Sequence, residues 1–325
     1  MDNTQALTTA GTTDYQAASA YLASLKSTVG RRAMAVALRK VARLLGHTDI
    51  NDVNWATLNA ASVDALISNI RGEHGQTLAP ASVALVLAGL RGVARAAWRR
   101  GTLDTETYER IRDVKGKSGS RGIAGRDVDA GERASLIQVC AADNSPAGYR
   151  DTALIAMLIA TGMRRAEVAS LQLADVVFTD DSAKVTLIGK GDKQRTAYIR
   201  NGALKALRDW LAVRGAATAH DTAGALFCAI NKAGVMQIEH GVSTTAIHLI
   251  LQKRVAEAGL ASLSAHDLRR TYVGEMLDAG ADVSTIAAIV GHASVATTAR
   301  YDRRGERAKE AAAGFISVPY KGRLT

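Results

Sequence analysis

The sequence predicts a mainly α-helical protein of two domains, the second of which contains a small β-sheet and hairpin insert. Three observations predict this fold class. Apolar residues recur at helical spacing through residues 1–114. The next segment, residues 115–128 (KGKSGSRGIAGRDV), has no apolar period and is rich in glycine, serine and basic residues, as is typical of a domain linker. In residues 129–325 helical patterns return, but they enclose three short β-rich runs.

The first domain is predicted to be a small helical bundle. Its strongest helix lies at residues 31–45, where apolar residues recur at i, i+4, i+7 and i+11. Ser62 is the expected N-cap of another helix, which Gly72 ends. The remaining helices are expected at residues 14–27, 81–100 and 105–114.

Two of these helices carry arginines opposite their apolar faces. The stripes are Arg32, Arg39 and Arg43 on one helix, and Arg91, Arg95 and Arg99 on the other. Each stripe could be an ordinary solvated face. Like charges one turn apart, however, cost an isolated helix roughly 0.2–0.5 kcal/mol per pair, so two such stripes favour contact with phosphate groups. The basic 115–128 segment could likewise lie along a nucleic-acid backbone or be a soluble tether.

The second domain reads as helical around a strand-rich insert. Helices are expected at residues 149–160, 165–171, 203–213 and 243–258, and strands at residues 176–178, 185–188 and 196–199. The last two strands flank residues 189–193 (GKGDK), whose glycines and charges are typical of a hairpin tip. This tip presents Lys190 between two glycines.

Composition narrows the class of protein. With 325 residues and 47% hydrophobic content, the chain can fold two cores. The net charge of +10 favours a polyanionic partner, but aromatic residues make up only 4%, which argues against stacking of single-stranded bases. Cys140 and Cys228 form no CxxC pair, which argues against a disulfide framework and a thiolate zinc site. We expect a cytoplasmic, nucleoid-associated protein without a membrane anchor, because the longest apolar stretch, near residues 153–160, is too short to span a bilayer.

The residues suited to chemistry gather after residue 260. Ser264 and Asp267 have the spacing of a capping box, which places His266 in the first turn of a helix and Arg269 one turn later on the same face. The free N–H groups and positive dipole end of such a helix favour an anion, and a phosphate would fit there. A further helix is expected at residues 283–290.

Two more candidate residues follow this helix. Gly291 stops it and leaves His292 on a turn. Ser294 can then cap a helix that carries Tyr301. Each candidate has an ordinary alternative: a capping histidine, an Arg164–Glu167 pair at i+3, or a tyrosine at a core edge. Their joint occurrence in this order is what favours a site.

These motifs resemble those of the tyrosine recombinases, or phage-type integrases. The matching stretches are residues 161–167 (TGMRRAE), 189–193 (GKGDK), 266–271 (HDLRRT), Gly291-His292 and Tyr301. The resemblance implies a clamp of two domains around duplex DNA: a helical core-binding domain (1–114), the linker (115–128) and an α+β catalytic domain (129–325). The expected activity is site-specific cleavage and rejoining of DNA through a 3′-phosphotyrosyl intermediate and a Holliday junction. Neither metal nor cofactor is expected.

The resemblance also implies residue roles. Arg164 and Arg269 would bind the scissile phosphate, His266 would be the base, Lys190 the general acid, His292 a phosphate donor and Tyr301 the nucleophile. Glu167 would orient the surroundings of Arg164. Tyr272 and Tyr320 compete as nucleophiles but rank lower, because the first shares the helix of Arg269 and the second lies in the tail.

The apolar tail, about residues 314–325, and the biological role leave alternatives. The tail could dock on a neighbouring protomer in a DNA-bound tetramer or pack on its own domain. The enzyme would serve a mobile element by integration, or resolve cointegrates or multimers, with possible help from accessory proteins. Two rival functions are a type IB-like topoisomerase and a non-catalytic DNA-binding regulator on the same scaffold.

Overall fold

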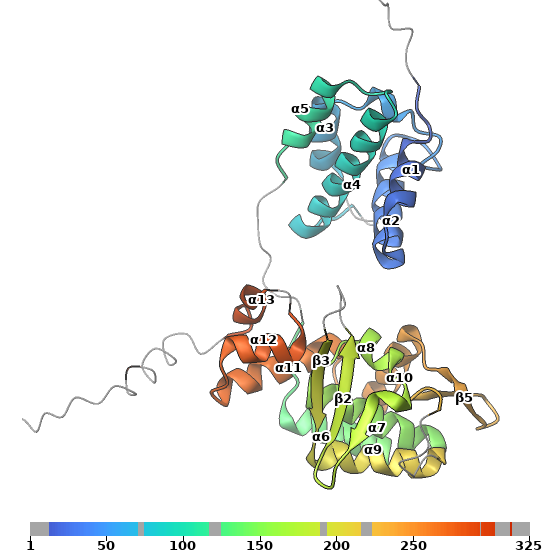
Figure 1. Cartoon of the computed structure of the whole chain (residues 1–325), viewed down its shortest axis with the longest axis vertical. Coiled ribbons are helices and arrows are strands. Elements are labelled where there is room, and N and C mark those ends of the chain that lie inside the picture. Colours follow the sequence, from blue (N-terminus) through green and yellow to red (C-terminus); the bar gives the residue numbers. More distant parts are fainter. Residues whose placement is uncertain are drawn as a thin grey trace, which may run out of the picture. The chain divides into compact units, whose positions relative to one another are not determined.

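The structure is a computed structural model that describes residues 13–70, 75–116, 125–188, 194–215, 223–292, 294–302 and 313 of the chain. It divides into two compact units, Met1–Gly122 and Ile123–Thr325, and both are rich in helix (Figure 1). The predicted fold class, mainly α with a small β insert, is confirmed.

The first unit is a helical bundle around one central helix. Its elements are α1 (Ala17–Ser24), α2 (Thr28–Leu44), the 3-10 helix η1 (Trp55–Thr57), α3 (Ala60–Asn69), α4 (Pro80–Arg99) and α5 (Thr105–Asp113). α4 contacts the four other α-helices, and its buried side chains include Val83, Leu87 and Leu90. This core is closed by the fully buried Trp55, whose Nε1 donates to Ile50 O at 2.8 Å.

The start of α3 differs from the prediction. Asn59, and not Ser62, is the N-cap: Asn59 Oδ1 accepts from Ser62 N at 2.9 Å. Ser62 is the third helical residue, and its Oγ accepts from Asn59 N at 3.0 Å. The two residues therefore form a reciprocal capping box in which serine takes the place of the usual glutamate. The helix also ends earlier than expected, at Asn69.

The long helix α4 is both strongly apolar and part of the core of the first unit. Among the described residues it is the one helix that is long and apolar enough to cross a membrane by length and composition. Its apolar side chains pack in the core of the first unit, however, and a buried core helix passes the same test. Burial in the bundle accounts for its composition.

The second unit combines helices with two small antiparallel sheets. Its helices are α6 (Ala130–Ala141), α7 (Pro146–Thr161), α8 (Arg165–Ser170), the 3-10 helix η2 (Leu173–Asp175), α9 (Asn201–Arg214), α10 (Thr244–Glu257), α11 (Ala265–Asp278), α12 (Val283–Val290) and α13 (Val295–Ala299). The strands are β1 (Val176–Phe178), β2 (Ala183–Ile188), β3 (Gln194–Ile199), β4 (Cys228–Ile230) and β5 (Met236–Gly241). α6 and the β4–β5 pair are elements that the sequence analysis missed.

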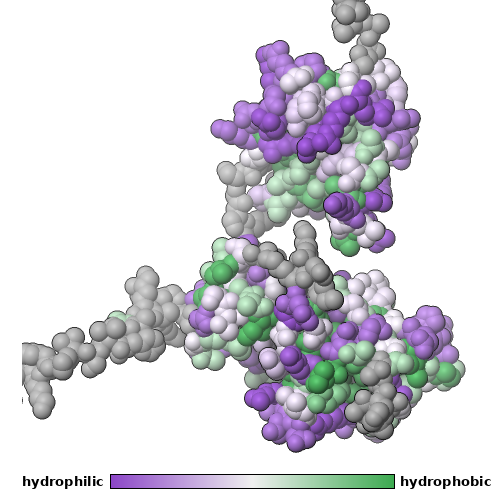
Figure 2. Space-filling model, in the orientation of Figure 1, coloured by the Kyte–Doolittle hydropathy of each residue, from purple (hydrophilic) through white to green (hydrophobic). Residues whose placement is uncertain are grey.

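The three-stranded sheet has order β1-β2-β3 and two unlike faces. Because side chains alternate along a strand, Ala197 and Ile199 face the core, where β3 contacts α7. The opposite face exposes Val177 and Tyr198, each with 61% of its surface accessible. Figure 2 shows hydrophobic colour on the visible surface over this sheet.

α7 leads the chain from the core to the candidate site. It is the most buried helix of the second unit and ends at Gly162, whose φ of +58° makes the left-handed turn that stops the helix. Met163 then lies fully buried, so that Arg164 follows at a fixed position as the N-cap of α8. The turn thus delivers Arg164 to the surface of the packed core.

Candidate active site

The N-terminus of α11 is capped as the sequence predicts. Ser264 Oγ accepts from Asp267 N at 3.3 Å, and Asp267 Oδ2 accepts from Ser264 N at 2.8 Å. This box fixes His266 in the first turn and Arg269 one turn later. The hydrogen bonds to Ser264 and to Arg126 N hold the pKa of Asp267 below its usual value although burial opposes them, so the carboxylate stays charged at the cap.

A short strap, residues 125–128, lies on α11 and reinforces this cap. Arg126 N donates to Asp267 Oδ1 at 3.0 Å, and Val128 N donates to Thr271 Oγ1 at 2.9 Å. The strap comes close because Gly125 has φ +107° and no side chain: a Cβ there would lie 2.2 Å from Asp267 Oδ1. The strap therefore helps to hold the helix that carries two of the predicted site residues.

Three arginines converge on the C-terminus of α12. The last three carbonyls of this helix end are those of Ile289, Val290 and Gly291, and they accept from Arg195, Arg269 and Arg164 respectively. Cations are favourable at a helix C-terminus, where backbone carbonyls lack helical partners. The end of α12 thus holds three guanidinium groups side by side, immediately before His292.

Glu167 is the acid that organises two of these arginines. Its Oε1 accepts from Arg164 Nη1 at 3.0 Å, while its Oε2 accepts from Arg164 N and from Arg195 Nη2, both at 2.7 Å. One carboxylate therefore fixes both the backbone and the side chain of Arg164. The Arg164–Glu167 pair at i+3, which the sequence analysis kept as an ordinary alternative, is present.

Arg269 is the buried member of the cluster, with 3% of its surface exposed. Its Nη1 donates to Gly162 O at 2.7 Å and its Nη2 to Val290 O at 2.6 Å. Burial, with a further contribution from Arg164, lowers its pKa to about 10. Cations crowded together in this way form a site in which an anion would be stabilised.

Tyr301 lies beside the predicted base. Its Oη is 3.3 Å from His266 Nε2, and its side chain is buried, with 8% of the residue exposed. The helix expected to carry it is shorter than predicted: α13 ends at Ala299, and Tyr301 follows in a turn. Ser294 is nevertheless the N-cap, as expected.

His292 completes this side of the site. Its ring stacks on that of Tyr301 with centroids 6.1 Å apart and an interplanar angle of 16°. Its Nδ1 lies 2.7 Å from Thr298 Oγ1. Burial, together with the positive charges of Arg269 and Arg164, lowers the pKa of His292 to about 4. The imidazole is therefore neutral at physiological pH.

These side chains line two cavities. One, of about 310 Å³, is lined by Arg164, Arg165, His248, Ser264, Ala265, His266 and Arg269. It is large enough for a phosphodiester group and its surroundings supply several N–H donors. Among its lining residues, Arg165 and His248 were not predicted as site residues.

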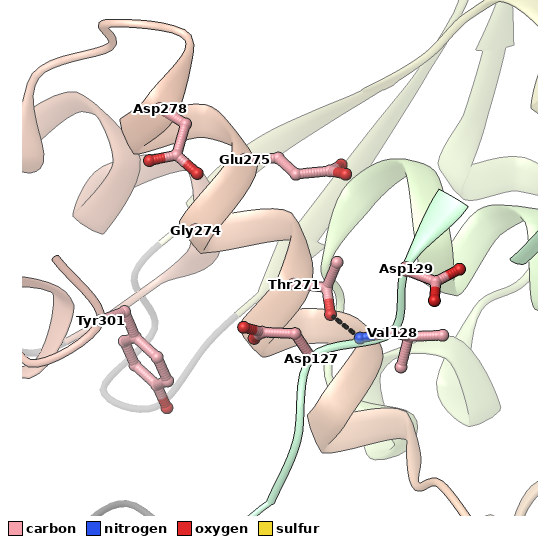
Figure 3. Close-up of a pocket in the computed structure, with 8 residues that line it drawn as sticks. All are labelled: Asp127, Val128, Asp129, Thr271, Gly274, Glu275, Asp278 and Tyr301. Carbon is pink, nitrogen blue, oxygen red and sulfur yellow. Dashed lines mark hydrogen bonds between the residues drawn. The ribbon is translucent and has the colours of Figure 1, made fainter. Parts of the chain in front are cut away.

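The second cavity, of about 170 Å³, is lined by Tyr301 together with residues of the strap and of α11. Figure 3 shows Tyr301 beside α11, with the side chain of Asp127 on the strap facing it. Glu275, Asp278 and Asp129 also line this cavity, which makes its lining acidic. Within the described part of the chain, no three His, Cys, Asp or Glu side chains are grouped so as to hold a metal ion.

The structure thus brings together Arg164, Glu167, His266, Arg269, His292 and Tyr301. Lys190 lies outside the described residues, as does the 314–325 tail with Tyr320. Tyr272 is on α11 as expected, with its ring against Gly162 and its pKa raised by burial. Arg195 is the main residue that the sequence analysis missed. Its signal was the strand period, which puts this charged residue on the same face as Ala197 and Ile199.

The predicted arginine stripes lie on the first unit. Arg32, Arg39, Arg43, Arg95 and Arg99 are exposed on α2 and α4, and Figure 2 shows strongly hydrophilic patches on the visible face of this unit. Arg91 differs from the others. It is half-buried and its Nη2 donates to Val114 O at the end of α5, while its buried Nε has no hydrogen-bond partner among the described residues.

Comparison with known proteins places this geometry in a family. A model described as the Phage integrase family matches residues 127–307. The tyrosine recombinase XerC of Chromohalobacter salexigens is 30% identical over 277 residues, which cover 82% of this chain and 82% of the relative. XerC of Haemophilus ducreyi is 31% identical over 268 residues, which cover 81% and 80%.

Solved structures with a similar fold belong to the same class of protein. XerH site-specific recombinase in a post-cleavage complex with palindromic difH substrate matches with a TM-score of 0.63 and 20% identity, covering 88% of this chain and 80% of that one. A lambda integrase dimer bound to a COC′ core site matches with a TM-score of 0.62 and 15% identity, covering 90% and 78%. At these identities the likeness concerns the fold alone. The family match includes all the predicted catalytic positions, and with the XerC relatives it identifies this chain as a member of the phage integrase family and a site-specific tyrosine recombinase.

Proposed function

We propose that this enzyme cleaves and rejoins duplex DNA at a specific site through a covalent bond to Tyr301. The observation that carries the proposal is the 3.3 Å approach of Tyr301 Oη to His266 Nε2, beside the cavity that Arg164 and Arg269 line. A phenol keeps its proton at neutral pH, so a tyrosine nucleophile needs a base within hydrogen-bond reach. His266 is that base.

The scissile phosphate binds in the 310 Å³ cavity. Each guanidinium has five N–H groups. Arg164 and Arg269 each use two of their side-chain N–H groups in the bonds described above, which leaves three for a phosphate within the part of the chain that the structure describes. Forked guanidinium donors stabilise the charge that builds on the non-bridging oxygens in the transition state. Neutral His292 adds a hydrogen bond to one of these oxygens.

The reaction conserves the phosphoester. Tyr301 Oη attacks phosphorus and gives its proton to His266 as the new O–P bond forms. The bond between phosphorus and the 5′ oxygen breaks, and Lys190 protonates the leaving oxygen. The products are a 3′-phosphotyrosyl link and a free 5′ hydroxyl. The hydroxyl of a second strand reverses the step, so the chemistry itself requires no nucleotide hydrolysis.

The exposed charge of the helical domain and the number of strands to be cut determine the proposed complex with DNA. The exposed arginines of α2 and α4 bind the DNA backbone, so that the helical domain and the catalytic domain clamp the duplex. Two duplexes need four active sites, which implies a tetramer, with the 314–325 tail docked on a neighbouring protomer. We further propose that the enzyme works in the cytoplasm on the nucleoid and serves a mobile element, by integration or by resolution of cointegrates or multimers.

Covalent capture from a random DNA library tests the assignment and finds the target sequence in the same experiment. Wild-type protein is incubated with a random-sequence duplex library in which each molecule carries a nick near the centre, so that cleavage releases a short strand and traps the adduct. Detergent-resistant complexes are then isolated and sequenced. We expect wild type to enrich one sequence family, and Tyr301→Phe to bind that sequence without forming an adduct.

Two phenylalanine variants serve as controls. Tyr272→Phe removes the rival hydroxyl on α11 but keeps the ring that packs against Gly162, and Tyr198→Phe changes an exposed residue of β3. Both should form the adduct at near wild-type rates. An adduct in Tyr301→Phe, or its loss in Tyr272→Phe alone, would show that Tyr301 is not the nucleophile.

A plasmid assay separates the rival enzyme function. If wild-type protein relaxed supercoiled plasmids that lack the captured sequence, a topoisomerase would be favoured over a site-specific recombinase.

A further inference from the structure

We propose that Arg195 is a positioning residue that keeps Arg164 available for the scissile phosphate by drawing the charge of Glu167 to itself. The inference rests on the proposed role of Arg164. It concerns a residue that touches neither the phosphate cavity nor Tyr301: the cavity of about 310 Å³ is lined by Arg164 and Arg269 but not by Arg195.

Burial distinguishes Arg195 from Arg164, its neighbour at the end of α12, while Arg269 is buried like Arg195. Only 9% of its side chain is exposed, against 46% for Arg164. A buried arginine loses its hydration, and this burial lowers the pKa of Arg195. Such a residue is retained only where charge and hydrogen bonds replace water. For Arg195 these come from Glu167 and from the carbonyl of Ile289.

Glu167 links Arg195 to Arg164. Its carboxylate is 14% exposed and is shared by the two guanidinium groups, with Arg195 Nη2 on Oε2 and Arg164 Nη1 on Oε1. If Arg195 lost its charge, this nearly buried carboxylate would have Arg164 as its remaining cation. Glu167 would then pair more tightly with Arg164 and neutralise the charge that the phosphate needs.

Arg195 also contacts the end of α12, to which Arg164 is bonded. Arg195 donates to Ile289 O, two residues before Gly291, whose own carbonyl accepts from Arg164 Nη2 at 2.8 Å. Arg195 also packs against Gly291: a Cβ there would lie 2.8 Å from Arg195 Nε. Arg195 therefore helps to position both groups that hold the Arg164 side chain, which are the Gly291 carbonyl and the Glu167 carboxylate.

The test compares single-turnover cleavage on two nicked duplexes of the captured sequence. One duplex carries the ordinary phosphodiester, and the other carries a methylphosphonate at the scissile position, which removes the negative charge of one non-bridging oxygen. On the phosphodiester we expect Arg195→Met to slow adduct formation roughly 10–100-fold, because loss of a transition-state donor costs about 100-fold or more and Arg195 acts one step removed. On the neutral methylphosphonate the loss should shrink to about 3-fold or less, since Arg164 has less charge to stabilise.

Two further variants complete the design. Lys184→Met removes an exposed cation from β2 of the same sheet and should cleave both duplexes at wild-type rates. Arg195→Met with Glu167→Gln removes the charge that would otherwise capture Arg164. This double variant should cleave the phosphodiester at least about 3-fold faster than Arg195→Met alone, because coupled charges behave non-additively.

The outcomes separate this inference from the proposed function. If wild type forms the Tyr301 adduct but Arg195→Met cleaves normally, or loses the same factor on both duplexes with no recovery in the double variant, Arg195 has no positioning role. If wild type forms no adduct at Tyr301, the proposed function fails first. A variant that unfolds would show in its thermal transition, and an unfolded Arg195→Met whose double variant is also inactive would count against the inference.

Discussion

Gly291→Ala would place a methyl group directly against the arginines at the end of α12. Gly291 has φ +68°, and an L-residue pays about 1–2 kcal/mol for this left-handed conformation. The new Cβ would also lie 2.8 Å from Arg195 Nε and 2.9 Å from Arg195 Cδ. Arg195 cannot easily move, because Glu167 and the Ile289 carbonyl hold it. Overpacking of this kind typically costs about 1–3 kcal/mol, for a total loss of about 2–5 kcal/mol in unfolding free energy.

Gly280→Ala is the matched control. Gly280 ends α11 with φ +89° and has nothing within 4 Å of an added Cβ, so it carries the backbone cost alone. The two variants should therefore differ by the packing cost, about 1–3 kcal/mol, which corresponds to about 2–12 °C in the thermal transition of a unit this size. Gly291→Ala should also slow cleavage more than about 10-fold, because small misplacements of catalytic groups are costly. Equal transitions for the two variants would refute the argument that Arg195 is rigidly held.

Two further predictions concern DNA affinity and pH. Replacing both Arg95 and Arg99 with glutamine should weaken DNA binding and reduce the steepness of log K against log salt concentration by about 2. The same change at Arg110 and Arg112, which pair with Glu106 and Glu109 on α5, should leave this slope nearly unchanged. Equal slopes in wild type and both variants would remove the α4 stripe from the DNA interface. Because the pKa of His292 is lowered to about 4 from a usual value near 6.5, the unfolded chain binds more protons in that window, and stability should fall as pH drops from about 6.5 to 4. His292→Asn should flatten this dependence in urea unfolding, and parallel curves for the two proteins would contradict the shift.

Local signals carried most of the fold prediction. The bounds of α12 and of β1 agree with the predicted 283–290 and 176–178, because a glycine or a turn residue ends each element. The capping box of α11 was also visible in sequence, so the positions of His266 and Arg269 on that helix could be inferred. Where the signal was a cap a few residues away from the true one, as for α3, the start of the helix was misplaced.

The missed elements depended on tertiary contacts or on signals left unused. α6 begins with a capping box of Asp129 and Glu132, which the sequence contains, but its apolar pattern is weak. The exposed strand β5 has little hydrophobic alternation and pairs with β4 across an irregular register. Arg195 became recognisable as part of the site only once β3 was placed against the end of α12.

The strap on α11 has a practical consequence for dissecting the enzyme. A catalytic fragment that began at residue 129 would discard Arg126, which besides its bond to Asp267 donates to Ala261 O at 2.8 Å and to Glu132 Oε2 at 2.7 Å. It would also discard Val128, which is fully buried. Fragments prepared for biochemistry should therefore start upstream of Gly125, so that the amino end of the shortened protein retains the residues that tie it to its own catalytic helix.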